Sequence, residues 1–379
     1  MKGLAITSKG IEDISALEIK ELINSESEIQ DSCVIFNIKK LEDLCLLCYK
    51  SQSIEKILFL LDYFDIKELN NKISGLDFSN WLDKETTFKV SCKKINNEDF
   101  SSEEITGNTG ALIIENIKKN KKYRQRVDLD NPNITFLLFI NKNTAYFGID
   151  FSGTDLHKRE YKLFAHPNSL RSTIAYSLLR IAGLKDKEIL LDPFCHSGEI
   201  PIEAAFFTIN FPVNYFSKEK FAFLKFKQFK KFNFDKLFKN IDKKILKPKK
   251  PLINCLDPKL MNLTAAKKNA KIAGINKAIS FSRMDTEWLD TKLKKETIDK
   301  IVTHLPDLTK NSNPKEIEKM YNEFFYQAEF ILKKKGKVVT ISRNTDLLKK
   351  SAEKYKFKLE KEREVWSGKQ VLNVLVFVK

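Results

Sequence analysis

The stretch Asp192-Pro193-Phe194-Cys195-His196-Ser197-Gly198-Glu199-Ile200-Pro201-Ile202-Glu203-Ala204-Ala205 decides how this chain is expected to fold. It begins at the end of an apolar run, Glu188–Asp192, and leads into a helical pattern. It therefore predicts a strand, a tight turn and a helix. Such a turn presents backbone N–H groups and little side-chain bulk, so a polar ligand can lie close to the chain.

Short apolar runs alternate with helical patterns on both sides of this stretch. We expect strands over Leu252–Leu256, Ala278–Phe281, Ile298–Thr303, Lys337–Ile341 and Gln370–Val378. We expect helices over His166–Ala182, Pro258–Ile272, Pro314–Leu332 and Asp346–Tyr355. This alternation predicts an α/β fold with a parallel, doubly wound sheet. Ligands of such sheets bind at the carboxyl ends of the strands, near the topological switch point.

The first 150 residues predict two smaller α/β units. Strands are expected over Leu4–Thr7, Cys33–Asn37, Ile54–Phe59, Phe88–Cys92, Ile134–Ile140 and Ala145–Ile149. Ser101, Ser102 and the two glutamates that follow have capping-box chemistry and predict a helix start. The expected boundaries are 1–65 and 66–150 for the two units, 151–185 for a linker with the first helix of the next domain, and 186–379 for the doubly wound domain.

Composition restricts the cellular setting. The chain has 379 residues, of which 42% are hydrophobic and 31% charged, which is ample for buried cores and excludes a disordered chain. No apolar run approaches the ~18 residues of a membrane span, so no membrane partner is expected. The N-terminus shows no secretion signal, and six cysteines without dense pairing suit a reducing cytosol, so a cytoplasmic location is expected. The oligomeric state stays open.

Charge points to a polyanionic partner. The formal net charge is +17, and it is unevenly spread. Residues 1–150 hold 20 basic and 24 acidic side chains, whereas the remainder holds 47 basic and 26 acidic ones. A field of this size favours nucleic acid. An AT-rich genome would also enrich lysine, but it does not explain the asymmetry.

Two basic segments are candidates for contact with RNA. The first carries six cations and one aromatic, namely Lys118, Lys119, Lys121, Lys122, Tyr123, Arg124 and Arg126. It could bind phosphate and stack on a base, or it could be a solvated helix end favoured by the helix dipole. The second segment, residues 216–250, has 13 Lys, 3 acidic residues and eight Phe. Most of its Phe side chains are expected to pack on the domain.

Asp257 follows the next expected strand of the doubly wound sheet. A carboxylate in this place can accept hydrogen bonds from both hydroxyls of a ribose. The four histidines, at 157, 166, 196 and 304, lack metal-ligand spacing, so no metal is expected.

Several motifs in the middle of the chain resemble known families. Phe88-x-Val90, Phe100-Ser101-Ser102-x-x-Ile105, Val127-Asp128-Leu129-x-Asn131-Pro132 and Phe147-Gly148-Ile149-Asp150 resemble the THUMP RNA-binding domain. Residues 151–161 are similar to the junction that follows THUMP in RNA methyltransferases. The resemblance implies a ferredoxin-like N-terminal unit, a THUMP domain and a Rossmann-like methyltransferase domain.

The stretch 192–205 resembles motif I of S-adenosylmethionine-dependent methyltransferases that act on amino groups of nucleobases. The resemblance implies that cofactor and adds an Asp at 285, beside the adenine, and the segment from His166 to Leu170. The residues so implied in cofactor binding are His166, Pro167, Asn168, Ser169, Leu170, Asp192, Pro193, Phe194, His196, Ser197, Gly198, Glu199, Asp257, Asp285 and Thr286.

The target-base motif of the family, Asn/Asp-Pro/Leu-Pro-Tyr/Phe-Gly, corresponds here to His304, Leu305, Pro306 and Asp307. The resemblance implies that His304, Pro306 and Asp307 are catalytic and that the reaction is methylation of RNA, at guanine N2 of tRNA. A neutral imidazole could accept the amine hydrogen.

Four positions depart from the family pattern: His196, Glu199, His304 and Asp307. A side chain at 196 would crowd the methionine part of the cofactor or require a positive φ. The alternative is therefore a non-catalytic RNA-binding protein derived from such an enzyme.

Overall fold

The computed structural model describes residues 1–95, 100–247, 250–308 and 312–379. These residues form two compact units. The first comprises Met1–Thr7, Ser15–Leu156 and Phe216–Leu237. The second comprises Ser8–Ile14, His157–Tyr215 and Phe238–Lys379. Residues 216–237 thus belong to the first unit, although residues of the second flank them in the sequence.

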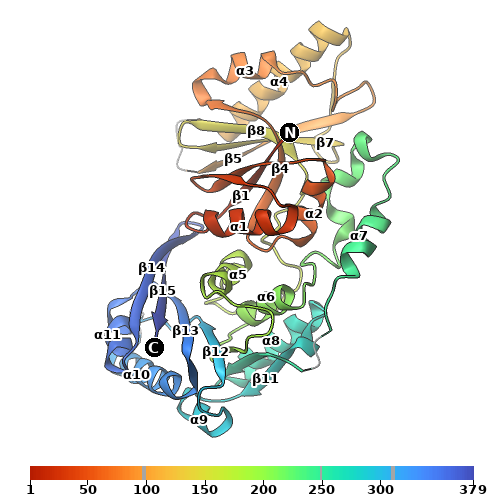
Figure 1. Cartoon of the computed structure of the whole chain (residues 1–379). Coiled ribbons are helices and arrows are strands. Elements are labelled where there is room, and N and C mark those ends of the chain that lie inside the picture. Colours follow the sequence, from red (N-terminus) through yellow and green to blue (C-terminus); the bar gives the residue numbers. More distant parts are fainter. Residues whose placement is uncertain (96–99, 248–249, 309–311) are drawn as a thin grey trace. The chain divides into compact units, whose positions relative to one another are not determined.

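Among the described residues, the first unit forms an eight-stranded mixed sheet with the order β2-β3-β1-β4-β8-β7-β5-β6 (Figure 1). Its strands are β1 (Lys2–Thr7), β2 (Ser27–Gln30), β3 (Cys33–Asn37), β4 (Ile54–Asp65), β5 (Thr87–Ile95), β6 (Arg126–Val127), β7 (Ile134–Asn141) and β8 (Thr144–Asp150). Neighbouring strands are antiparallel, except that β5 runs parallel to β6 and β7.

Strand β4 joins the parts expected over residues 1–65 and 66–150. The sequence predicts an end at Phe59, but the strand continues to Asp65. Its first half pairs with β1 and its second half with β8, so one strand carries hydrogen bonds of both parts. Residues 1–65 and 66–150 therefore share a single sheet.

Helices α1 (Glu12–Ile23), α2 (Glu42–Lys50), α3 (Leu69–Gly75) and α4 (Ser102–Lys121) accompany these strands. Helix α4 starts where the sequence predicts: the Ser101 side chain accepts a hydrogen bond from the amide of Glu104. Ile105, Ile113 and Ile117 are buried on one face of the helix. The predicted N-cap is thus confirmed.

The segment 216–237 packs its aromatic rings into the first unit. Phe226 lies edge-on to Trp81 and Phe151, with ring centroids 5.8 and 5.0 Å apart. Further buried rings of the segment are Phe221, Phe223 and Phe229. Most of these Phe side chains are buried as expected, but their contacts lie in the first unit and not in the doubly wound domain to which the sequence assigned the segment. Pro248 and Lys249, which belong to the basic segment, lie outside the described residues.

In the part of the chain that the structure describes, the second unit forms a seven-stranded sheet with the order β11-β10-β9-β12-β13-β15-β14. Its strands are β9 (Leu190–Asp192), β10 (Ile253–Asp257), β11 (Ile279–Arg283), β12 (Ile298–Thr303), β13 (Leu332–Ser342), β14 (Lys358–Ser367) and β15 (Gln370–Val378). Strands β9 to β13 are parallel and β14 and β15 antiparallel, which confirms the predicted doubly wound arrangement. Because β9 lies between β10 and β12, the order reverses there, and the loops after β9 and β12 flank the switch point.

The helices after residue 150 are α5 (Ser172–Ile181), α6 (Glu199–Thr208), α7 (Phe234–Asp242), α8 (Leu260–Ile272), α9 (Leu289–Lys292), α10 (Pro314–Ile331) and α11 (Asp346–Lys354). The helix expected over His166–Ala182 is present but begins only at Ser172, so its predicted start is wrong. The His166 Nδ1 atom accepts a hydrogen bond from the Asn168 amide at 3.1 Å, and such local bonds compete with helix formation. No helix among the described residues combines the length and the apolar character that a membrane crossing requires.

Candidate active site

The turn after β9 holds residue 196 in a left-handed conformation. His196 has a φ of 49°, which is uncommon for histidine. Its amide N–H is fixed by Asp257 Oδ2 at 3.0 Å. Gly198, with a φ of 89°, allows close packing, because a Cβ there would lie 2.9 Å from the Cβ of Ala266 on α8. The turn is therefore packed tightly against β10 and α8.

Three imidazoles from three separate segments meet beside this turn. The His196 ring stacks on His166 with centroids 4.4 Å apart, and it lies edge-on to His304 at 5.7 Å. His196 Nε2 is 3.0 Å from the His304 carbonyl oxygen, which can only accept, so Nε2 carries the hydrogen. Its Nδ1 atom is then a buried acceptor without a hydrogen-bond partner in the described residues. Burial, and after it the charges of His304 and His166, lower the pKa of His196 to about 3, so the ring is neutral at physiological pH.

The turn after β12 presents His304 and Asp307. His304 Nδ1 donates to the Asn168 carbonyl oxygen at 3.1 Å, which leaves Nε2 as the acceptor of the neutral ring. This Nε2 atom lies 3.8 Å from Asp307 Oδ2. Asp307 also accepts hydrogen bonds from the Ser342 hydroxyl and the Arg343 amide. Burial raises the pKa of Asp307, but a hydrogen bond from the His304 ring, which requires the protonated ring, and the bonds from Ser342 and Arg343 outweigh it, so the pKa lies below its usual range.

Most hydrogen-bond acceptor positions of Asp257, at the end of β10, are taken by donors of the protein. Its Oδ1 accepts from the Lys259 amide and from Asn262 Nδ2, and its Oδ2 accepts from the His196 amide. Each carboxylate oxygen can accept about two hydrogen bonds, so one acceptor position is left on Oδ2. Asp285 follows the neighbouring strand β11 and is exposed to solvent.

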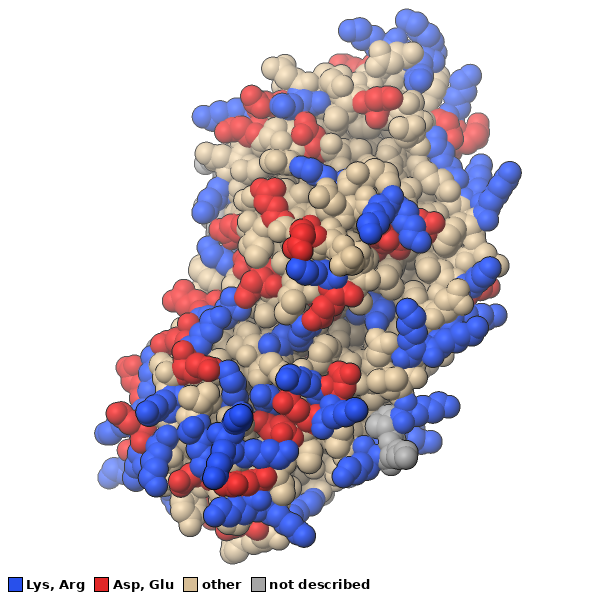
Figure 2. All heavy atoms as spheres, in the orientation of Figure 1, with Lys and Arg blue, Asp and Glu red and all other residues tan. Residues whose placement is uncertain are grey.

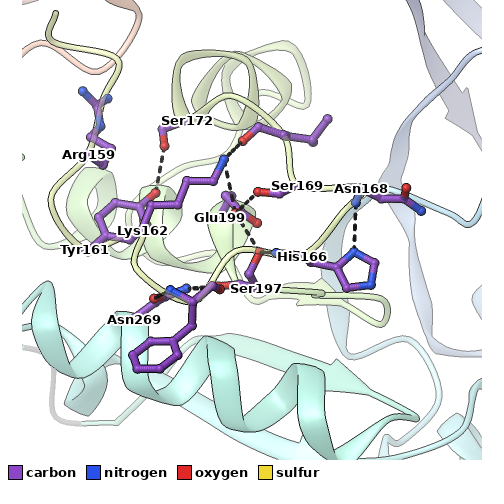
Figure 3. A network of polar contacts seen from close by, with 12 residues as sticks. Arg159, Tyr161, Lys162, His166, Asn168, Ser169, Ser172, Ser197, Glu199 and Asn269 are labelled. Atoms are coloured by element: carbon purple, nitrogen blue, oxygen red, sulfur yellow. Dashed lines mark hydrogen bonds and ion pairs between the residues drawn. The ribbon is translucent and has the colours of Figure 1, made fainter.

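Glu199 links the turn after β9 to the segment that contains His166 (Figure 3). Its Oε1 accepts hydrogen bonds from the hydroxyls of Ser169 and Ser197, at 2.7 and 2.8 Å, and lies 3.5 Å from the Lys162 ammonium. The His166 amide in turn donates to the Ser197 hydroxyl at 3.1 Å. Glu199 is buried, and its side chain is therefore used to hold the 162–171 segment against the turn.

The structure thus brings many of the predicted cofactor residues together. They differ in whether they are hydrogen-bonded, buried or exposed. Those in the hydrogen-bonded or stacked group are His166, Asn168, Ser169, His196, Ser197, Glu199 and Asp257. Those buried beneath it are Leu170, Asp192, Pro193, Phe194 and Thr286, whereas Pro167 and Asp285 are exposed. The Pro306 carbonyl accepts a hydrogen bond from the Tyr321 hydroxyl at 2.8 Å, which fixes the turn after β12.

The sequence did not single out Asn269 as a site residue. This fully buried side chain of α8 donates to the Ser197 carbonyl oxygen at 2.9 Å and also binds the backbone of Phe164. The available signal was an amide on the otherwise apolar helix face of Ala266 and Ala270.

Asp192 gives the site a pH-dependent stability. Its carboxyl is buried, and burial raises its pKa from 3.8 to about 8, although Thr303 Oγ1 and the Phe194 amide donate to it. The folded protein therefore keeps a proton that the unfolded chain loses above about pH 4. Its stabilising contribution is complete below that pH and is lost as the pH rises toward 8.

Asp192→Asn keeps the acceptor oxygen and removes the loss of stability between about pH 4 and pH 8. We expect the free energy of unfolding to rise on the order of 2–4 kcal/mol at pH 8 and to change little at pH 4. Denaturant titrations at both pH values measure this, with the exposed Asp290→Asn as the control. An equal change at the two pH values would contradict the assignment.

The predicted RNA-binding cluster lies at the end of α4 in the first unit. All its cations are exposed, and Lys122 forms the left-handed C-cap of the helix. Arg126 is bound to Glu85, with Nη2 3.0 Å from Oε2. Tyr123 is half-buried beneath the ammonium of Lys84. The four lysines and Arg124 form no ion pair among the described residues, so they present a solvated positive surface.

Sheet order, the carboxylate after β10 and the paired turns after β9 and β12 together define a Rossmann-like methyltransferase domain. Residues 159–373 match the family model of the RMKL-like methyltransferase domain, and residues 63–150 match that of the THUMP domain. The chain belongs to the RMKL-like methyltransferase family and carries a THUMP domain. The predicted family and fold class are thereby confirmed.

Two archaeal relatives match nearly the whole chain. One is a tRNA (guanine(6)-N2)-methyltransferase of Methanocaldococcus jannaschii, 30% identical over 95% of each chain. The other, with the same name, is from Archaeoglobus fulgidus and is 26% identical over 99% of this chain and 91% of the relative.

Solved structures share the fold. A putative methyltransferase, SMU.472, complexed with SAH has a TM-score of 0.84 at 19% identity and covers 100% of this chain and 97% of its own. TrmN from Thermus thermophilus has a TM-score of 0.72 at 21% identity, with 100% and 99% covered.

Proposed function

We propose that this methyltransferase transfers a methyl group from S-adenosylmethionine to N2 of guanine 6 in tRNA, in the cytoplasm. The observation that carries the proposal is the convergence of the turns after β9 and β12 beside Asp257, in a chain that matches two such enzymes over nearly its full length. The THUMP domain and the basic surface support RNA as the substrate.

The residues at the switch point fit this cofactor. The acceptor position left on Asp257 suits a ribose hydroxyl, and the unpaired Nδ1 of His196 suits a hydrogen of the methionine ammonium group. In this proposal the exposed Asp285 accepts a hydrogen bond from the adenine amine. When bound, the cofactor supplies an electrophilic methyl group on a sulfonium. Because the His196 ring is neutral, it adds no positive charge beside that sulfonium.

His304 and Asp307 are the candidates for orienting the guanine amine. His304 Nε2 is an acceptor in the neutral ring, and Asp307 is kept ionised by its hydrogen bonds. Either acceptor can bind an N–H of the amine and turn the nitrogen lone pair toward the methyl group. The turn between them is fixed by Tyr321, so positioning supplies most of the catalysis in this mechanism.

Methylation of defined transcripts tests the proposal. The purified chain is incubated with labelled S-adenosylmethionine and with tRNA transcripts that carry guanosine or adenosine at position 6. We expect N2-methylguanosine, identified by nucleoside mass spectrometry, only with guanosine at position 6. Label on another amine would reassign the target. Binding of both RNA and cofactor without any methyl transfer would favour the non-catalytic alternative.

RNA binding by the cluster at the end of α4 is expected to be electrostatic. Replacing Lys118, Lys119, Lys121 and Lys122 by glutamine should reduce the slope of log K against log salt by about 0.7–0.9 for each phosphate that is no longer neutralised. Filter binding across a salt series measures this slope. The control replaces Lys39, Lys40, Lys67 and Lys72, which are exposed lysines of the same unit. Equal slopes for the two variants would remove the cluster from the interface.

A further inference from the structure

Two large apolar side chains are exposed in the segment that precedes His166. Leu163 is 71% exposed and Phe164 is 40% exposed. Scattered exposed apolar residues are common, but these two are adjacent and border the segment that contacts the turn after β9. Their position therefore calls for a partner.

Phe164 is held rigidly by its backbone. Its amide donates to Asn269 Oδ1 at 3.1 Å, and its carbonyl oxygen accepts from Asn269 Nδ2 at 3.0 Å. Asn269 is fully buried and also binds the Ser197 carbonyl oxygen (Figure 3). One amide thus fixes both the backbone that carries the exposed ring and the turn of the candidate active site. A binding residue placed in this way gives up little conformational freedom when it meets its partner.

One cation lies beside the ring, and two more are exposed on the same helix as that cation. The Lys268 ammonium lies 4.7 Å from the centroid of Phe164. Helix α8 contains no acidic residue and exposes Lys267, Lys268 and Lys271, none of which forms an ion pair in the described part of the chain. Figure 2 shows Lys and Arg side chains spread widely over the visible face of the protein, with Asp and Glu between them. An aromatic face next to unpaired cations matches a base with its phosphate.

We propose that Phe164 stacks on an unpaired base of the RNA substrate and that Lys267, Lys268 and Lys271 contact its phosphates. This inference rests on the proposed function, because it takes RNA as the substrate. It adds a contact surface on the methyltransferase unit to the one expected on the THUMP domain. A protein partner at this surface would leave RNA affinity independent of Phe164.

Equilibrium binding of a tRNA transcript to the full chain, without cofactor, tests the inference. Phe164→Ala should weaken binding roughly 5- to 100-fold, on the scale of base–aromatic stacking, and Phe164→Trp should retain it. The salt slope of Phe164→Ala should equal that of the wild type, whereas Lys268→Gln should lower it by about 0.7–0.9. The matched control is Phe330→Ala on α10, since Phe330 is also 40% exposed, and it should change affinity less than twofold.

The possible failures are distinguishable. If the wild type binds and methylates the tRNA and Phe164→Ala binds it equally well, the stacking inference is overturned and the proposed function is left intact. A failure of Phe164→Trp to restore binding, or a reduced salt slope in Phe164→Ala, would also overturn it. Absence of RNA binding by the wild type would refute both.

Discussion

Glu203→Ala is expected to lower the free energy of unfolding of the second unit by about 3–5 kcal/mol, since it removes the carboxylate that binds a buried guanidinium. The Glu203 carboxylate binds Arg159 through two hydrogen bonds, Nε–Oε1 at 3.0 Å and Nη2–Oε2 at 3.2 Å. Both side chains are at most 1% exposed. The Tyr161 hydroxyl also donates to Oε1 at 3.0 Å. Alanine would therefore remove both of these bonds from a guanidinium in the core.

Urea denaturation of the variants measures this effect. The control is Glu362→Ala, whose ion pair with Lys349 is about a third exposed and should contribute less than about 1 kcal/mol. Arg159→Met combined with Glu203→Leu should recover much of the stability, because both charges of this pair are then removed together. Equal destabilisation by Glu203→Ala and Glu362→Ala would contradict the argument.

Asp257→Ala is expected to weaken binding of S-adenosylmethionine by about 1.5–3 kcal/mol, roughly 10- to 150-fold. The carboxylate is the proposed partner of the ribose. It also fixes the His196 amide, so its removal frees the turn after β9. Asp257→Asn should lower the affinity as well, because all three protein partners of the carboxylate are donors and an amide group cannot accept from each of them.

Isothermal titration calorimetry with the cofactor measures this effect. Asp290→Ala, an exposed aspartate of the same unit, is expected to bind as the wild type does. Unchanged affinity in Asp257→Ala would refute the assignment of this residue.

Strands with a clear apolar pattern could be predicted from the sequence. The bounds of β12 and β15 agree with the expected ones: β12 contains the apolar residues Ile298, Ile301 and Val302, and β15 ends in the apolar run Val374–Val378. Strand β14 was missed: its residues Lys358 to Glu364 are mostly charged and exposed, so no alternation of apolar side chains marks it. It is recognised only through its pairing with β15 at the edge of the sheet.

The candidate site was predictable as a set of residue types but not as a set of contacts. A positive φ at residue 196 was one of the expectations, because the family has glycine there. The bonds from Ser169 and Lys162 to Glu199 join residues 30 and 37 positions apart, and no local pattern indicates them. The placement of residues 216–237 in the first unit could not be predicted for the same reason. It depends on aromatic contacts with Trp81 and Phe151, which are distant in the sequence.

The long strand β4 limits where this protein can be divided. The THUMP match begins at Tyr63, within the last residues of that strand. An excised fragment from this position would lack most of the partner strand of β8 and expose an open, apolar sheet edge, which invites self-association. The THUMP match, residues 63–150, is therefore smaller than the compact unit to which it belongs. A usable RNA-binding fragment has to start at β1 and to include the aromatic segment 216–237.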